Sequence, residues 1–293
     1  MGINTSIATL LCRAGQQGTS FGHTLTIGRQ SMTVPRAELQ RLARKFELDS
    51  AGVAAVTSNG WAEEFFIQYL GAEHVSSMDY SDYESASIVH DLNTSIPEDL
   101  HERFDAVIDG GSIEHIFDVK QVLENYMQMV KPGGSLFIAA PANNLCGHGF
   151  YQFSPEFFYR VFNEDNGFRV VDMVVIETPL LTVEASRHQK YFRVLDPEKV
   201  RKRVQLLSRK PVMLFVHAEK VSSVPLFAKS PYQSDFKTQW DESAQTGAAE
   251  SARAATGTQG FEYLSRWSEW RKRLRQWRKH GLHRGKFYTR FDP

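Results

Sequence analysis

Two aspartates stand where short apolar segments end, and their carboxylates could hold a ribose and a base. Asp79 lies near the end of Val75–Tyr80, and Asp91 follows Ile88–His90. An acid at the carboxyl end of the second strand of a nucleoside-binding sheet accepts hydrogen bonds from two ribose hydroxyls. Asp91 could accept from the amine of adenine while Leu92 covers a face of the ring. Acids at strand ends also solvate loops, but two at successive strand ends favour the binding interpretation.

A Glu–His pair is the best candidate for proton transfer. Glu114 and His115 follow the apolar segment Phe104–Ile108 after a few residues. Imidazole titrates near neutral pH, so His115 could remove a proton from a hydroxyl or an amine. The structural alternative is that this histidine caps or packs the helix that follows.

A second group of hydrogen-bonding side chains follows a later apolar segment, and we expect it to line a substrate site. Its members are Asn143, Asn144, His148, Tyr151 and Gln152. Glycines and aromatic residues separate them, which suits the rim of a site better than a plain turn. His148 is the alternative catalytic base. Cys146 beside it lacks further ligands at metal-site spacing, so we expect no metal here.

A strand–helix–strand unit must position these residues. Phe104–Ile108 and Ser135–Ala140 are short apolar runs typical of buried strands. Between them Ile116–Val130 carries apolar residues at helical spacing, and Lys131–Gly134 predicts a tight turn. Strands joined by a helix lie parallel, and ligands of parallel sheets bind beyond the carboxyl ends of the strands.

Further strands and helices are predicted on both sides of this unit. The predicted strands are His23–Gly28, Val75–Tyr80, Ile88–Asp91, Phe168–Ile176 and Pro211–Ala218, with Val53–Val56 as a competing candidate. The predicted helices are Pro35–Phe46, Trp61–Leu70 and Ser154–Phe162. Alternating strands and helices indicate an α/β fold with helices on both faces of the sheet.

Six short motifs follow one another along the predicted strands and helices. They are Asp79, His90-Asp91-Leu92, Phe104-Asp105-Ala106-Val107, Glu114-His115, Lys131-Pro132-Gly133-Gly134 and Asn166-Gly167-Phe168. In this order they resemble class I S-adenosylmethionine-dependent methyltransferases, and especially the type 11 and type 12 groups with Leu/Ile-Glu-His after the fourth strand. The resemblance spans roughly residues 23–218. It implies a Rossmann-like, seven-stranded, mostly parallel sheet flanked by helices.

The resemblance also implies a cofactor, S-adenosyl-L-methionine, across the carboxyl edge of the sheet. Asp79 would hold its ribose, Asp91 with Leu92 its adenine, and Tyr80 is a further expected cofactor-binding residue. The segment Asp109-Gly110-Gly111 would form the floor beside the sulfonium. The implied reaction is methyl transfer to an oxygen or nitrogen of a small molecule or glycan precursor, with His115, Glu114 or His148 handling the proton.

The first strand departs from the family pattern, which has an acid followed by Gly-x-Gly-x-Gly. The chain offers Ile27-Gly28-Arg29-Gln30, which has the better strand alternation, or Thr57–Gly60, which has the better spacing to Asp79. We favour the former, with Gly28, Arg29 and Gln30 at the cofactor. Arg29 would pair with its carboxylate, and Gln30 would replace a backbone contact. The alternative is a degenerate fold that acts as a non-catalytic binding or scaffold protein.

The composition of the chain limits the classes of protein to which it can belong. The chain has 293 residues and equal numbers of basic and acidic residues, 34 of each, which argues against a general nucleic-acid binder. Its 2 cysteines cannot form a disulfide framework, so we expect a cytoplasmic protein. No apolar run approaches the roughly 18 residues of a spanning helix, and Ile7–Cys12 is too short for a signal peptide.

The composition changes in the C-terminal quarter of the chain, from about residue 222 onward. We divide the chain into an N-terminal segment 1–20, a methyltransferase-like domain 21–221, a flexible linker 222–260 and a basic Trp-rich helix 261–293. Trp267, Trp270 and Trp277 would form an aromatic stripe on that helix. It would lie on a membrane surface, or dock on a protein partner or on its own sheet. Nucleic-acid binding ranks third, and the oligomeric state stays open.

Overall fold

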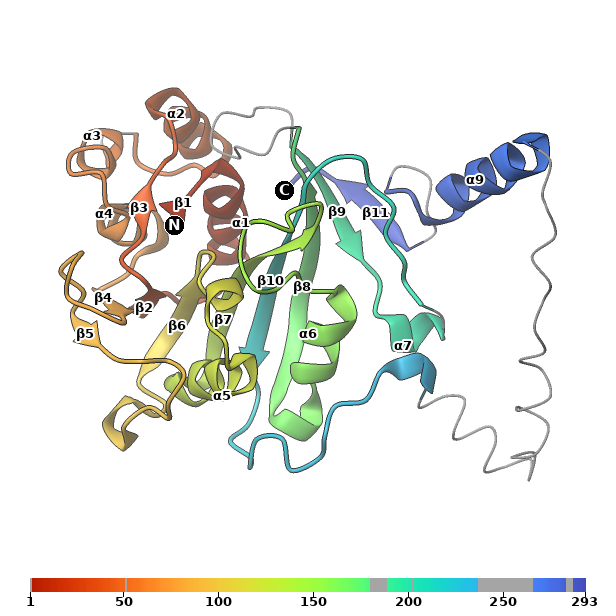
Figure 1. Ribbon diagram of the computed structural model, residues 1–293. Coiled ribbons are helices and arrows are strands. Elements are labelled where there is room, and N and C mark those ends of the chain that lie inside the picture. Colours follow the sequence, from red (N-terminus) through yellow and green to blue (C-terminus); the bar gives the residue numbers. More distant parts are fainter. Residues whose placement is uncertain (1, 51, 180–188, 202, 237–265, 283–286) are drawn as a thin grey trace.

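A nine-stranded sheet is the centre of the molecule (Figure 1). The computed structural model describes residues 2–50, 52–179, 189–201, 203–236, 266–282 and 287–293. In spatial order the strands are β11 (Tyr288–Phe291), β9 (Lys190–Val194), β8 (Phe168–Glu177), β10 (Val212–Lys220), β7 (Val130–Asn143), β6 (Phe104–Asp109), β2 (His23–Ile27), β4 (His74–Asp79) and β5 (Ile88–Val89).

The sheet is mixed. From β5 to β7 all neighbours pair parallel, in the order 3-2-1-4-5 of a doubly wound nucleotide-binding fold. Strand β10 pairs antiparallel with both β7 and β8, and β9 and β11 add further antiparallel pairs. The Rossmann-like α/β architecture is confirmed. The predicted seven strands are wrong, because β9 and β11 extend the sheet at one edge.

Helices cover both faces of the sheet, because neighbouring residues of a strand point to opposite sides. Val107 joins the hydrophobic cluster that contains α5 (Val119–Met129) and α6 (Pro155–Val161). Ala106 and Ile108 join the cluster on the other face, which contains α1 (Thr5–Gln16), α2 (Arg36–Lys45) and α4 (Glu63–Leu70). The remaining short elements are β1 (Gly2–Ile3), β3 (Ser31–Met32), η1 (Glu98–Leu100), η2 (Ile113–His115), η3 (Glu164–Asn166) and α7 (Pro197–Val200).

Local sequence signals explain where the helices begin and end. The hydroxyl of Ser154 accepts a hydrogen bond from the backbone N–H of Phe157 at 3.3 Å, and Pro155 occupies the first turn of α6. Helix α4 ends at Gly71, which adopts the left-handed conformation with φ 70°. The predicted helices at these places are therefore confirmed, with ends shifted by one or two residues.

Two predicted elements are wrong. Val53–Val56 belongs to a short helix, α3 (Gly52–Val56), since a brief apolar run has no periodicity that separates strand from helix. The predicted turn at Lys131–Gly134 lies within β7, which begins directly after α5. The pairing of β7 with β6 shifts there, and Gly133 takes up the distortion with φ 80°.

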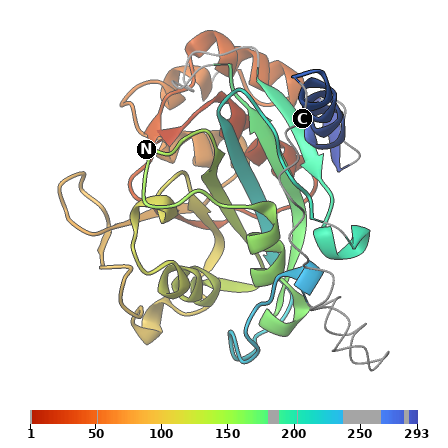
Figure 2. The ribbon, with the colours of Figure 1, turned by 45° about the vertical axis from the view of Figure 1, so that its right-hand side comes forward.

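Segments outside the predicted domain 21–221 pack against the same sheet and helices as that domain does. Helix α1 is buried in the second cluster, and β11 joins the sheet beside β9. Helix α9 (Arg266–His280) leads toward β11 at this edge, which Figure 2 shows in blue.

Residues 222–236 of the predicted linker are described and contact α6 and η3, for example through Ser234 and Glu156, whereas 237–260 lie outside the described residues. No helix within the described residues is long and apolar enough to cross a membrane.

Candidate functional site

A cavity of about 270 Å³ opens beyond the carboxyl ends of β2 and β4. Its lining residues are Ile27, Gly28, Met78, Asp79, Tyr80, His90, Asp91, Leu92, Asn93, Ser112, His115 and Ile116. The structure thus brings together Gly28, Asp79, Tyr80, Asp91 and Leu92 of the residues predicted to bind a cofactor, with His115 at the same cavity. Sequence analysis missed His90 and Asn93, which flank the predicted Asp91-Leu92 pair and are polar at a strand end.

Both strand-end acids present carboxylates to this cavity. Asp79 Oδ1 accepts a hydrogen bond from the backbone N–H of Tyr80 at 2.7 Å, and no described residue bonds to its Oδ2. Asp91 Oδ1 accepts from the backbone N–H of Asn93 at 2.9 Å and from its side-chain amide at 2.8 Å. These two bonds hold the pKa of Asp91 below its usual value, so this carboxylate is charged at neutral pH.

Asp109 has a structural role instead. Its buried carboxylate accepts hydrogen bonds from the backbone N–H groups of Gly111, Ser112 and Ile113. The hydroxyl of Tyr126 donates a fourth bond at 3.0 Å. Burial raises the pKa of Asp109 although these bonds oppose the shift. Asp109 therefore caps η2, and none of the predicted floor residues Asp109, Gly110 and Gly111 lines the cavity.

Gln30 occupies the crevice between β2 and β6, where the strand order reverses. Its buried side chain donates to the carbonyl of Ile27 at 2.5 Å, and a Cβ on Gly110 would lie 2.3 Å from its Oε1. Arg29 is engaged elsewhere, since its Nε donates to Glu63 at 2.7 Å and its guanidinium lies 4.5 Å from the Trp61 ring centre. Neither Arg29 nor Gln30 lines the cavity, so cofactor contacts through them stay predictions.

Glu114, His115 and His148 converge beside the cavity. Glu114 Oε1 lies 3.4 Å from His148 Nε2 and 4.0 Å from His115 Nε2. The Glu114 side chain is 0% exposed, and within the described part of the chain neither carboxyl oxygen has a hydrogen-bond partner. Burial and the charge of Asp109 raise the pKa of Glu114 to about 8. Burial and the neighbouring His148 lower the pKa of His115, which is therefore a neutral base at pH 7.

The loop after β7 brings His148 to this cluster. The backbone N–H of Phe150 donates to the carbonyl of Glu114 at 2.8 Å, which fastens the loop onto η2. Gly149 makes this approach feasible, because a Cβ there would lie 2.7 Å from the same carbonyl oxygen.

The other predicted substrate residues mostly brace this loop. The side-chain amide of Asn144 donates to the carbonyls of Ser208 and Lys210, both at 2.9 Å. Gln152 accepts from the backbone N–H of Leu145 at 2.9 Å, and the Tyr151 hydroxyl donates to the carbonyl of Phe117 at 2.7 Å. Asn143 Oδ1 accepts from the next backbone N–H at 3.1 Å. Substrate contact by these side chains stays a prediction.

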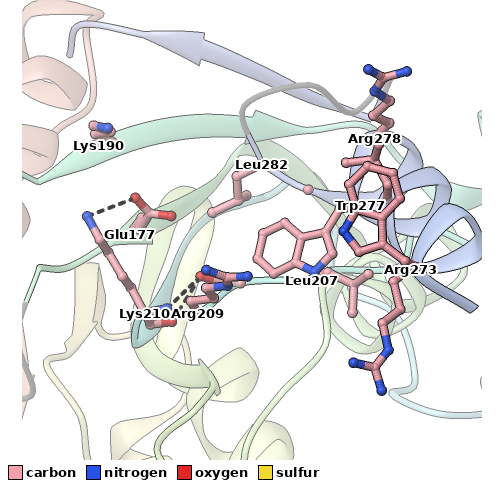
Figure 3. Close-up of a pocket in the computed structure, with 13 residues that line it drawn as sticks. Glu177, Lys190, Leu207, Arg209, Lys210, Arg273, Trp277, Arg278 and Leu282 are labelled. Carbon is pink, nitrogen blue, oxygen red and sulfur yellow. Dashed lines mark hydrogen bonds and ion pairs between the residues drawn. The ribbon is translucent and has the colours of Figure 1, made fainter. Parts of the chain in front are cut away.

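A larger cavity of about 700 Å³ lies between α9 and the chain before β10 (Figure 3). The Arg209 guanidinium lies 5.0 Å from the ring centre of Trp277, and Lys210 pairs with Glu177 at 3.6 Å. The backbone N–H of Leu207 also bonds to the carbonyl of His280 at 3.0 Å. The contacts of Trp277 with Arg209 and of His280 with Leu207 dock the end of α9 on the body of the protein. Trp267 lies outside the described side chains, and the membrane and partner contacts stay predictions.

Comparison with known proteins adds little to this picture. No protein-family model matches the chain, and no curated protein matches it. Similar solved structures include a methyltransferase candidate from Bacillus halodurans, with 10% identity, a TM-score of 0.39 and coverage of 72% of this chain and 99% of that one. They also include the N-methyltransferase NodS from Bradyrhizobium japonicum (13% identity, TM-score 0.37, coverage 74% and 96%). A third is 1,6-didemethyltoxoflavin-N1-methyltransferase from Burkholderia thailandensis, bound to S-adenosylhomocysteine (13% identity, TM-score 0.36, coverage 74% and 78%). Similarity at this level says nothing about the activity or substrate of this chain.

Proposed function

We propose that this chain is an S-adenosyl-L-methionine-dependent methyltransferase that acts on an oxygen or nitrogen of a small molecule or glycan precursor. The observation that carries the proposal is the cavity at the carboxyl edge of the sheet, which has Asp79 and Asp91 at neighbouring strand ends and His115 in the same lining. Carboxylates in these two places suit a ribose and an adenine, and Leu92 offers an apolar ring contact.

We assign the adenosyl part of the cofactor to this cavity, because its lining holds both strand-end acids and Leu92. A volume of about 270 Å³ is slightly below the range of roughly 300–1,000 Å³ that is usual for drug-sized ligands. Asp79 would bind the ribose hydroxyls through Oδ2, while Tyr80, whose residue surface is 74% exposed, would cover the opening. When bound, the cofactor supplies an electrophilic methyl group.

The chain's own contribution to the reaction would be to hold the acceptor and remove its proton. His115 is suited to this role because its ring lines the cavity and its lowered pKa keeps it neutral at pH 7. His148, whose ring centre lies 5.3 Å from that of His115, is the second candidate base. Glu114 is largely protonated at this pH and would orient the two imidazoles.

Calorimetric titration with S-adenosylhomocysteine tests the proposal. We expect saturable binding by the wild type and a loss of roughly 10- to 150-fold in Asp79→Ala, which corresponds to about 1.5–3 kcal/mol for hydrogen bonds to a charged group. Asp82→Ala is the matched control, because Asp82 is an exposed acid in the same loop and does not line the cavity. Equal affinities of the two variants would remove Asp79 from the cofactor site.

One observation favours the alternative of a degenerate, non-catalytic fold. Gln30 fills the crevice between β2 and β6, where nucleotide-binding sheets of this order usually take their ligand. The same titration separates the alternatives. Absence of binding by the wild type, together with binding by Gln30→Gly, would show that this side chain closes the site and would support a scaffold role.

A further inference from the structure

The carboxylate of Glu114 is buried without the partners that a buried carboxylate needs. Its side chain is 0% exposed, and neither oxygen accepts a hydrogen bond from any residue that the structure describes. A carboxylate that leaves water normally regains its lost hydration from hydrogen bonds, an ion pair or a metal. Two imidazole nitrogens lie near Glu114 Oε1, the Nε2 atoms of His148 at 3.4 Å and of His115 at 4.0 Å.

The spacing of these three groups is that of a metal-ligand set. In a tetrahedral site with bonds of about 2.0–2.2 Å, two ligand atoms lie about 3.4 Å apart. The Glu114–His148 pair already has this separation, and all three ligand atoms lie within 4.8 Å of one another. The imidazole side chains are 43% and 49% exposed, so their rings can close the remaining gap by rotation.

The fold holds all three ligands on braced elements, so the cluster is not a chance meeting of mobile side chains. Glu114 and His115 lie on η2, which Asp109 caps with three backbone hydrogen bonds. His148 lies on a loop that is fastened to Glu114 by the Phe150 N–H. Sequence analysis missed the site because only this docking brings His148 to the Glu–His pair.

We infer that Glu114, His115 and His148 form a binding site for a divalent transition-metal cation, with Zn²⁺ as the ion that this ligand set suits. One carboxylate and two imidazoles are the donors that zinc takes in sites with three protein ligands, where the fourth position stays open. Mg²⁺ and Ca²⁺ prefer oxygen ligands and fit this set poorly. The open position would face solvent and the cavity, because His115 also lines that cavity.

A cation here would have a direct use in methyl transfer, and this use, unlike the binding, rests on the proposed function. A hydroxyl that occupies the open position would release its proton to solvent water more readily, because the metal stabilises the resulting oxyanion. That oxyanion would form the new bond to the methyl group, and the thioether would leave as the methyl–sulfur bond breaks. In the metal-bound protein the cation would take over the activation of the acceptor that His115 would supply in the metal-free protein.

Metal titration of the full chain, after treatment with a chelator, tests the site. Co²⁺ serves as a spectroscopic probe of coordination, and Zn²⁺ affinity is measured by competition with a chromophoric chelator. We expect one equivalent to bind, with visible absorption typical of four or five ligands. We expect Glu114→Gln and His148→Ala to lose roughly 100-fold or more in Zn²⁺ affinity. Millimolar Mg²⁺ should not compete.

His101→Ala is the matched control, since His101 is an exposed histidine outside the cluster and should leave the affinity within about twofold of wild type. His148→Ala removes an exposed ring, so it folds even where a change at the buried Glu114 does not. Binding of less than one equivalent by the wild type, or affinity unchanged by His148→Ala, would overturn the site. Titration of the metal-free protein with S-adenosylhomocysteine is a separate readout, so the metal site and the methyltransferase proposal can fail independently.

Discussion

Glu114 is the residue whose chemistry depends most on its surroundings. A glutamate in water ionises well below neutral pH, but burial and Asp109 raise the pKa of Glu114 to about 8. The folded chain therefore keeps a proton that the unfolded chain has lost between about pH 4.5 and pH 8. Because the folded state binds this extra proton, the unfolding free energy falls as the pH rises through this window. It levels off above the pKa of the folded state.

Glu114→Gln should remove this pH dependence in metal-free buffer. Glutamine has the shape of the protonated acid but cannot ionise, so the variant should match wild type near pH 5. Near pH 8.5 the variant should be more stable by about 3–5 kcal/mol, at about 1.4 kcal/mol per unit of pKa shift. Chemical denaturation at both pH values measures this difference. Glu98→Gln, at an exposed glutamate, is the control, and parallel pH profiles for wild type and Glu114→Gln would contradict the expectation.

At the scale of elements, the loop after β7 and the short helix η2 act as one unit. Their contact depends on Gly149, where an added Cβ would lie 2.7 Å from the carbonyl oxygen of Glu114 and 3.0 Å from its Cγ. The backbone bond from Phe150 to Glu114 and the position of His148 both follow from this approach.

Gly149→Ala should therefore separate the loop from η2. We expect a loss of about 1–3 kcal/mol in the unfolding free energy, the usual range for overpacking, together with weaker Co²⁺ binding because His148 moves away. Gly147→Ala is a close control, because a Cβ at Gly147 would meet nothing within 4 Å. Equal stability of the two variants would show that the loop does not need this close approach.

Sequence analysis predicts the elements that have local signals, but it does not predict the contacts that loops make around η2. Strands such as β2 and β6 and helices such as α6 are predictable, because periodicity and capping residues are local signals. The strand-end positions of Asp79 and Asp91 follow in the same way from β4 and β5. The contact of His148 with Glu114 does not, since it depends on a loop that docks across the sheet edge. Gln30 likewise reads as a loop residue, and its burial against Gly110 appears only in three dimensions.

At the scale of the whole molecule, the two ends of the chain meet the same sheet. The guanidinium groups of Arg13 in α1 and Arg193 in β9 make cation–π contacts with Phe291 of β11. Each lies 4.8 Å from the centre of the Phe291 ring. The sequence predicts a basic helix for residues 261–293, and part of it, α9, is helical. The strand that follows is too short for sequence periodicity to reveal, and its partner β9 is distant in the chain.

Whether β11 belongs to the folded body can be measured at two adjacent residues. Tyr288 is 5% exposed and packs in the cluster that holds α5 and α6, whereas Thr289 points outward from the same strand. We expect Tyr288→Ala to lower the unfolding free energy by about 2–4 kcal/mol, the cost of removing a large buried side chain. Thr289→Ala should change it by less than about 0.5 kcal/mol, since exposed substitutions away from special features have small effects. Chemical denaturation of both variants decides the point. A Tyr288→Ala protein as stable as the wild type would mean that residues 287–293 lie apart from the domain, as the division of the sequence into a core and a separate basic tail predicts.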